Sequence, residues 1–164
     1  MPARKKDTLF FDRPPVVAAW AAAGGKKESE GPLSSQFDFL TQDGGFSAQG
    51  CTDWEQAESL LQQKAAGLCL RKAGVAHKDV QLTFAGDLQA QCTASNYTMR
   101  TLGTPFAGVY GACSTMAETL ALAACFAACG LAQQALALTS SHFCAAERQF
   151  RTPLPYGAKR APTA

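Results

Sequence analysis

The stretch VYGACSTMAETLALAACFAACG, residues 109–130, decides how the rest of the chain is organised. Small residues and a Ser-Thr pair follow an apolar run, which is typical of a strand that turns directly into a helix. Gly130 then supplies the stop that helices favour. The pattern predicts a strand over 105–113, a helix over 114–130, and Cys113 in the turn between them.

Further strands and helices are predicted on either side of this unit. Apolar runs predict a first strand at Val16–Trp20, a second at 80–85 and another at 133–141. Helical periodicity appears at 52–74 and at 93–103. This alternation predicts an α/β fold, with a mainly parallel sheet built from βαβ units and helices on its faces.

The segment 52–74 carries the clearest helix signals. Thr52 or Asp53 is the candidate N-cap, and Gly74 is the expected C-terminal stop. Apolar residues recur at helical spacing along it, so one face is predicted to pack on the core. The residues of that face are Trp54, Ala57, Leu61, Ala65 and Leu68.

Composition excludes several classes of function. The chain has 164 residues and a formal net charge of +2, without a basic stripe interleaved with aromatics, so nucleic-acid binding is not indicated. Seven cysteines occur without C-x-x-C spacing, and His77 and His142 are the only histidines. A zinc site and a disulfide framework are therefore not predicted, and reduced thiols fit better.

Neither apolar segment is predicted to serve as a signal peptide or a transmembrane helix. Near the N-terminus the uninterrupted apolar run covers only 16–23, which is too short for either. The apolar helix at 114–130 contains Glu118 and many small residues, which favours burial in protein.

Three short polar segments follow predicted strands. They are Gly86-Asp87, the turn at 111–113 and the run Ser140-Ser141-His142. In open α/β sheets, ligands bind beyond the carboxyl ends of the strands. The topology therefore predicts that these segments converge on one edge of the sheet and form a site.

Cys113 admits three interpretations. A helix start carries free N–H groups and a partial positive charge, which lower a thiol pKa and also cradle a carboxylate. A nucleophile needs a base, and His142 is the one local candidate. Cys113 is thus a nucleophile, the floor of a binding pocket or a packed small residue, and the local pattern does not separate these.

The other two segments also carry structural alternatives. Asp87 is either a ligand contact or a turn residue or helix cap, which aspartate often provides. His142 either orients its loop, touches a ligand or is a satisfied structural histidine.

Several motifs together resemble the stage V sporulation protein AD family of spore-forming bacteria, within the thiolase-like superfamily. They are GPL with FD at 31–38, WEQAE at 54–58, AGDLQAQ at 85–91, YGACSTMAE at 110–118, TSSHFCAAERQFRTPLPYG at 139–157 and the final PTA. The resemblance runs from about residue 8 to the last residue. It implies the N-terminal half of a thiolase-like fold, with residues 1–24 as an arm and first strand and 25–164 as an incomplete thiolase-like domain.

The resemblance also implies a function. Members of this family are understood to bind dipicolinic acid, pyridine-2,6-dicarboxylate, with calcium as its counter-ion and no other cofactor. They work with membrane proteins of the same sporulation transport system. The residues matching the ligand-binding pocket are Asp87 and Cys113, with the segment Ser140, Ser141 and His142. No metal ligands are predicted.

Cys113 matches the acylated cysteine of true thiolases, whose other catalytic residues come from the second half of the fold. The resemblance therefore favours a non-catalytic binder in the forespore or spore, soluble or peripheral to the inner spore membrane. The resemblance also implies that this chain needs the second half of the fold or a homo-oligomer partner. The alternatives are an acyltransferase or condensing enzyme with Cys113 as nucleophile, and a truncated fragment without function.

Overall fold

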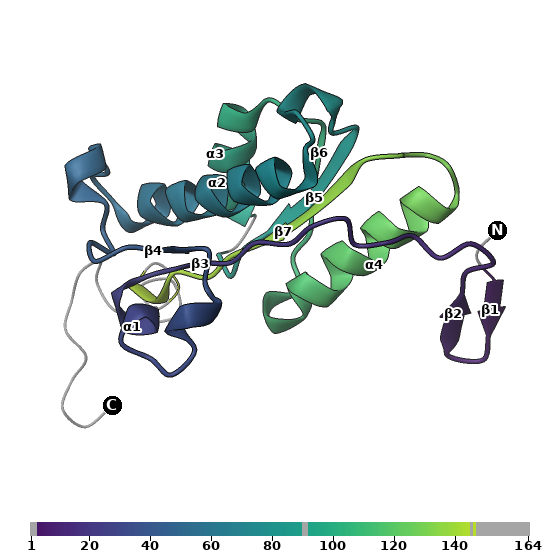
Figure 1. The fold of residues 1–164 in the computed structure, drawn as a ribbon, viewed down its shortest axis with the longest axis horizontal. Helices are drawn as coiled ribbons and strands as arrows, with labels where there is room; N and C mark the ends of the chain where they lie inside the picture. Colours follow the sequence, from purple (N-terminus) through teal and green to yellow (C-terminus); the bar gives the residue numbers. More distant parts are fainter. Residues whose placement is uncertain (1–2, 90–91, 145, 147–164) are drawn as a thin grey trace.

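The structure is a computed structural model that describes residues 3–89, 92–144 and 146. Figure 1 shows a central sheet with helices on both faces and an N-terminal hairpin that projects away from the body. The elements are β1 (Ala3–Lys5), β2 (Thr8–Phe10), β3 (Ala23–Gly24), α1 (Lys26–Ser29), β4 (Phe39–Leu40), α2 (Trp54–Ala73), β5 (Leu82–Gly86), α3 (Thr93–Leu102), β6 (Phe106–Gly108), α4 (Thr115–Ala128) and β7 (Ala135–Thr139). Short 3-10 turns lie at Ser34–Gln36, Ser47–Gln49, His77–Asp79 and Ala112–Ser114.

The central sheet has the strand order β6-β5-β7, and both pairings are parallel. Helix α3 connects β5 to β6 and α4 connects β6 to β7, so both connections are βαβ units. The α/β class and the parallel sheet are therefore confirmed, and they agree with part of a thiolase-like fold. The predicted strands at 105–113 and 133–141 are shorter than expected.

The main apolar core lies between the sheet and the pair α2–α3. Alternation along the strands turns Ala85, Leu136 and Leu138 to this side. The opposite face of β5 presents Phe84 to α4, where its ring meets Phe126 edge-on at a centroid distance of 5.0 Å. The remaining residues of the main core are Ala66, Leu70, Val80 and Met99.

Helix α2 begins after Asp53, the second of its two candidate N-caps, and ends at the predicted glycine. The Asp53 carboxylate accepts the Gln56 backbone N–H at 2.7 Å, and Gly74 closes the helix in the left-handed conformation with φ 67°. The predicted buried face is wrong in part, since Ala57 is buried but Trp54 is exposed. The buried side runs instead through positions four residues apart, namely Glu58, Gln62, Ala66 and Leu70.

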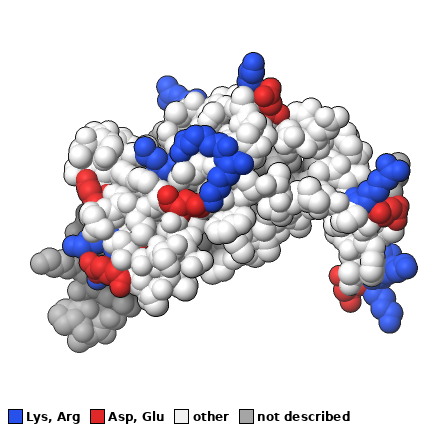
Figure 2. All heavy atoms as spheres, in the orientation of Figure 1, with Lys and Arg blue, Asp and Glu red and all other residues white. Residues whose placement is uncertain are grey.

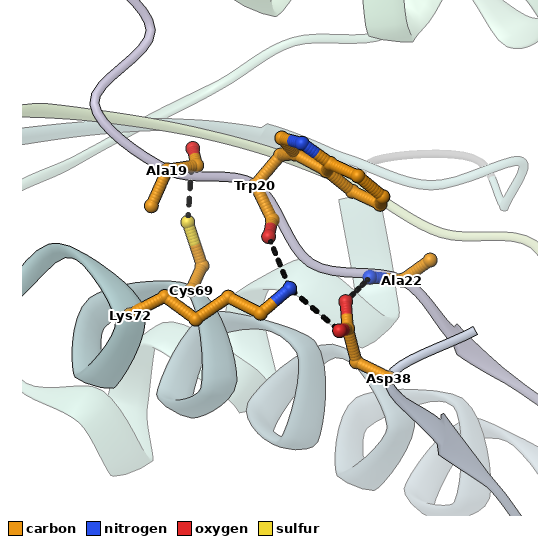
Figure 3. Close-up of polar contacts among 6 residues, drawn as sticks. All are labelled: Ala19, Trp20, Ala22, Asp38, Cys69 and Lys72. Carbon is orange, nitrogen blue, oxygen red and sulfur yellow. Dashed lines mark hydrogen bonds and ion pairs between the residues drawn. The ribbon is translucent and has the colours of Figure 1, made fainter. Parts of the chain in front are cut away.

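The predicted first strand at Val16–Trp20 is wrong. This segment has no regular secondary structure, and the first short strand of the body is β3, which pairs in parallel with β4. The segment passes α2 instead, where the Lys72 ammonium donates to the Trp20 carbonyl at 3.1 Å and lies over the Trp20 ring (Figure 3). Side-chain contacts to α2 thus take the place of strand pairing.

Asp38 completes this attachment. One carboxylate oxygen pairs with Lys72 at 2.5 Å, and the other accepts the Ala22 backbone N–H at 2.9 Å (Figure 3). The hydrogen bond from Lys72 lowers the Asp38 pKa, and the Ala22 N–H adds to the effect. Cys69 also donates its thiol to the Ala19 carbonyl at 3.5 Å.

The N-terminal arm folds as an antiparallel hairpin of β1 and β2. Leu9 and Phe10 on it are exposed. Among the described residues, none of the helices combines the length and the apolar character needed to cross a bilayer. The motif residues beyond Ala146, including the final PTA, lie outside the described residues.

Candidate ligand-binding site

The carboxyl ends of the three parallel strands meet at one edge of the sheet, as predicted. Gly86 at the end of β5 is in register with Thr139 of β7, and the Ser140 N–H donates to the Gly86 carbonyl at 3.2 Å. On the other side, the Val109 N–H donates to the Ala85 carbonyl at 2.9 Å. The segments that contain Asp87, Cys113 and Ser140 therefore all leave the sheet at this edge.

Gly86 allows the ends of β5 and β6 to approach closely. A Cβ atom on Gly86 would lie 1.9 Å from the Val109 carbonyl oxygen and 2.6 Å from Cγ2 of Thr115. Real Cβ atoms do not come this close to other heavy atoms. The contact brings the strand end against the first residue of α4, so glycine is required at this position.

Asp87 is fully buried and acts within the chain. Its Oδ2 accepts both the backbone N–H and the hydroxyl of Ser95, at 2.8 and 2.7 Å, and its Oδ1 accepts the Gln89 N–H at 3.0 Å. Ser95 lies in the first turn of α3, where the helix dipole stabilises the negative charge of Asp87. This geometry matches the helix-cap interpretation of Asp87.

Ser140 connects the end of β7 to two buried side chains of α2. Its hydroxyl donates to Oε1 of Glu58 at 2.6 Å and accepts from Nε2 of Gln62 at 2.7 Å. The same Gln62 amide nitrogen donates to the Ser95 hydroxyl at 3.0 Å. Since Ser95 binds Asp87, a continuous polar chain joins the ends of β5 and β7 through α2 and α3.

Glu58 is a second buried carboxyl near Asp87, because the residue is only 1% exposed. Burial raises the pKa of Glu58 to about 7, and the nearby charge of Asp87 adds to the rise. The Ser140 hydroxyl and the His142 backbone N–H oppose it by hydrogen bonding. Oε2 of Glu58 has no hydrogen-bond partner among the described residues.

His142 lies against α2 and the loop before it. Its Nε2 is 2.9 Å from the Gly44 carbonyl, which makes Nε2 the protonated nitrogen, and its ring stacks on Trp54 with centroids 5.3 Å apart. Nδ1 is buried and lacks a partner in the described part of the chain. His142 is thus held in place, and within the described ranges no hydrogen bond or ring contact joins it to Cys113.

Cys113 is exposed and lies in the 3-10 turn that precedes α4. Ala112 before it has a φ of 50°, a left-handed conformation that is uncommon for alanine. The Ser114 hydroxyl binds the Gly111 carbonyl and the Glu118 carboxylate rather than capping the helix. The free thiol therefore faces solvent at a strained turn, and no base is placed beside it by the contacts described here.

Two comparisons bear on the chain's relatives. Residues 5–164 match the family model of stage V sporulation protein AD. The chain belongs to the stage V sporulation protein AD family. It is 43% identical over 161 residues to stage V sporulation protein AD of Bacillus subtilis (strain 168), a match covering 97% of this chain and 46% of that protein. The chain thus spans about half the length of this curated relative.

In this stage V sporulation protein AD family member, the structure brings Ser140 and His142 together with α2 and links Ser140 to Asp87. Ser141 is exposed beside them. Cys113 leaves the same edge of the sheet, but within the described residues no hydrogen bond ties it to Asp87 or to the 140–142 segment. The predicted site therefore divides into a buried polar part and an exposed turn.

Sequence reasoning missed Glu58 and Gln62. Glu58 is the last residue of the motif WEQAE, and Gln62 lies four residues after it. The signal that could have revealed them is the spacing of four that they share with Ala66 and Leu70. A polar pair on an otherwise buried stripe predicts partners elsewhere in the fold.

The outer surface of α4 is apolar and open. Met116 is 59% exposed and Leu120 47% exposed, whereas only Thr115 and Thr119 of the helix are buried. Figure 2 shows uncharged surface over α4 on the face that it displays. A helix this apolar on its solvent side is typical of one that packs against further protein.

A groove of about 670 Å³ lies between α2 and α3 and contains none of the predicted site residues. Its lining includes Asp53, Gln56, Ser59, Tyr97 and Arg100. Within the described ranges, His, Cys, Asp and Glu side chains do not gather in threes as a protein-held metal would need.

Proposed function

We propose that this chain binds dipicolinate at the carboxyl edge of its sheet and does so without catalysis. The observation that carries the proposal is the meeting of three segments at that edge, namely Gly86-Asp87, Gly111–Thr115 and Ser140–His142. Membership of a sporulation family supports the choice of ligand, because dipicolinate is the compound that this family is understood to handle.

The chemistry of this edge suits a flat dicarboxylate. Helix α4 starts here, and its first N–H groups and positive dipole end favour an anion. The Cys113 thiol and the Ser141 hydroxyl are exposed. The thiol offers a small, weakly polar surface to the ligand, and the hydroxyl offers a hydrogen-bond donor. Asp87 contributes by positioning α3, since its oxygens are already held by three donors.

Calcium enters this proposal as cargo that accompanies the ligand. A bound Ca²⁺ needs six to eight oxygen ligands, and the described residues do not supply such a set. The carboxylates and ring nitrogen of dipicolinate would hold the ion themselves. Calcium would then offset the repulsion between the ligand and Glu118 beside the turn.

The partners follow from the same surface. We propose that the outer face of α4 is covered by the second half of the thiolase-like fold or by a second copy of the chain, in support of which stand the exposed Met116 and Leu120. The membrane proteins of the sporulation transport system and a place at the inner spore membrane remain part of this proposal.

Isothermal titration calorimetry with dipicolinate, with and without calcium, tests the proposal. Benzene-1,3-dicarboxylate is the matched ligand control, because it keeps both carboxylates and lacks the ring nitrogen. We expect Cys113→Ala to weaken dipicolinate binding about tenfold, a loss of roughly 1.4 kcal/mol. Cys129→Ala removes an exposed thiol at the far end of α4 and serves as the matched variant.

Unchanged affinity in both Cys113→Ala and Asp87→Asn would exclude the proposed site. Equal binding of the two dicarboxylates would show that the ring nitrogen and its calcium are not recognised. Acylation of Cys113 by an acyl-CoA with turnover would favour an acyltransferase instead.

A further inference from the structure

In the buried chain of polar side chains between the ends of β5 and β7, the hydrogen bonds are donated in a consistent direction. Nε2 of Gln62 uses one proton for the Ser95 hydroxyl and the other for the Ser140 hydroxyl. Ser95 donates onward to Asp87, and Ser140 donates onward to Glu58. All the donated protons therefore run outward from one amide to two carboxyl groups.

The two carboxyl groups accept different numbers of hydrogen bonds. Asp87 receives three hydrogen bonds over its two oxygens, which stabilises a buried negative charge. Glu58 accepts hydrogen bonds from the Ser140 hydroxyl and the His142 N–H, while Oε2 of Glu58 accepts none from the described residues. A second ionised carboxylate here would be both undersupplied and close to the first.

A second buried acceptor without a donor also indicates that Glu58 carries a proton. Oε1 of Gln62 is also buried without a partner among the described residues. Glu58 and Gln62 lie one helical turn apart on the same face of α2, and the described residues supply no donor to either of these two buried acceptors. A proton on Oε2 of Glu58 would supply one donor for this acceptor-rich region.

We propose that Glu58 is a positioning residue that carries a proton when the strand-edge site is ready for an anionic ligand, and that loss of this proton weakens binding by adding negative charge beneath Ser140 and His142. The effect on the ligand rests on the proposed function. The proton on Glu58 does not, because it follows from the buried hydrogen bonds alone.

The groups around Glu58 come from each neighbouring element. Asp87 faces it from the end of β5 and His142 from the end of β7. Helix α3 presents the neutral Ser95 and Thr98 to α2. Asp43 lies in the loop that contacts His142, and Glu55 lies one turn earlier on α2. This set contains neither a lysine nor an arginine that would hold Glu58 ionised.

The proton is tested on the ligand-free chain by ¹³C NMR of glutamate side-chain carboxyls. Glu58→Gln assigns the Glu58 signal among the six glutamates of the chain. We expect that signal to titrate with a midpoint between about pH 6 and about pH 8, against an ordinary pKa of 4.5 for this carboxyl. A midpoint below about pH 5 would overturn the proposal.

The coupling to ligand is tested by dipicolinate titrations between about pH 6 and about pH 8.5, where the ligand itself stays a dianion. We expect the affinity of the native chain to fall about three- to tenfold as the pH rises, because an ionised Glu58 repels the ligand. Glu58→Gln should bind with an affinity that changes less than about twofold. Glu55→Gln, which removes the same charge one turn away, should keep the native profile.

The outcomes separate the two proposals. Binding with the same pH dependence in the native chain and in Glu58→Gln overturns the coupling and leaves the dipicolinate site standing. Absence of binding at every pH overturns the proposed function together with the coupling, while the NMR midpoint still decides where the proton resides.

Discussion

The two faces of the central sheet differ in how their covering helices are exposed to solvent. On one face, α2 and α3 cover the strands, and even their polar side chains are buried and bonded to one another. On the other face, α4 packs against Phe84 of β5 through Phe126 but leaves Met116 and Leu120 in solvent. Among the described residues, one face is covered by two helices, and the helix on the other face has an exposed apolar surface.

The difference shows where each face obtains its stability. Buried polar groups cost free energy unless they are paired, so the α2 face depends on particular partners such as Gln62 and Ser140. Apolar groups in solvent cost free energy until they are covered, so the partner surface proposed above would stabilise the α4 face. The candidate site lies at the sheet edge where the two faces meet.

Gly86→Ala should break both faces at once and have the largest effect. The added methyl group would overlap the Val109 carbonyl, which is backbone and cannot turn aside, so the ends of β5 and β6 must separate. We expect at least about 3 kcal/mol of destabilisation in urea denaturation. Gly44→Ala meets no atom within 4 Å and should change stability by less than about 0.5 kcal/mol. Equal, small effects would contradict the close approach.

The pH dependence of stability isolates the α2 face. The Glu58 carboxyl titrates at about 7 in the folded chain against 4.5 as its ordinary pKa. Between these values the unfolded chain releases the proton first, so raising the pH favours unfolding and costs about 3 kcal/mol in total. Below about pH 4.5 and above about pH 7 this contribution is constant.

Denaturant titrations of native and Glu58→Gln chains across that window measure the effect. The difference in unfolding free energy between them should grow in favour of Glu58→Gln as the pH rises from about 4.5 to about 7. A difference that stays constant with pH would mean that Glu58 is ionised in the fold.

Gln62→Ala should have a smaller effect on the same face. It removes both hydrogen bonds that lead to Ser95 and Ser140 and leaves a gap among buried groups. We expect a loss of about 2 kcal/mol. Gln63→Ala, on the adjacent half-buried position with one bond to Ser59 at 3.2 Å, should lose less than about 1 kcal/mol. A larger loss of stability in Gln63→Ala than in Gln62→Ala would show that Gln62 is not the residue that connects the buried polar chain.

Substitutions on the α4 face should affect stability least and association most. The double variant Met116→Gln with Leu120→Gln changes exposed side chains, so its unfolding free energy should stay within about 0.5 kcal/mol of the native chain. Sedimentation velocity should show less self-association than in the native chain. Leu33→Gln is an equally exposed control away from α4. Native association that persists in the double variant would remove α4 from the interface.

Local signals explain which parts of the fold the sequence predicts. The ends of α2, at Asp53 and Gly74, and the strand β5 follow from capping and β-branched residues that act within a few positions. Val16–Trp20 has the same strand-like composition, but a strand also needs a partner, and Lys72 holds the segment at α2 instead. Composition alone does not reveal that choice.

The candidate site was predictable only in its outline. Parallel strands bring their carboxyl ends together whatever the side chains are, so the positions of Asp87 and Ser140 followed from the topology. Their contacts did not, because Ser140 binds Glu58, which lies 82 residues earlier in the chain. Such a pair becomes visible only when α2 is placed against the end of β7.

Thiol alkylation tests most directly whether dipicolinate binds at the turn that contains Cys113. Mass spectrometry after iodoacetamide treatment reports the rate at each cysteine, and both Cys113 and Cys129 are exposed. We expect dipicolinate to slow alkylation of Cys113 at least about fivefold, in proportion to the bound fraction, and to leave the rate at Cys129 unchanged. Equal rates at Cys113 with and without saturating dipicolinate would contradict the account.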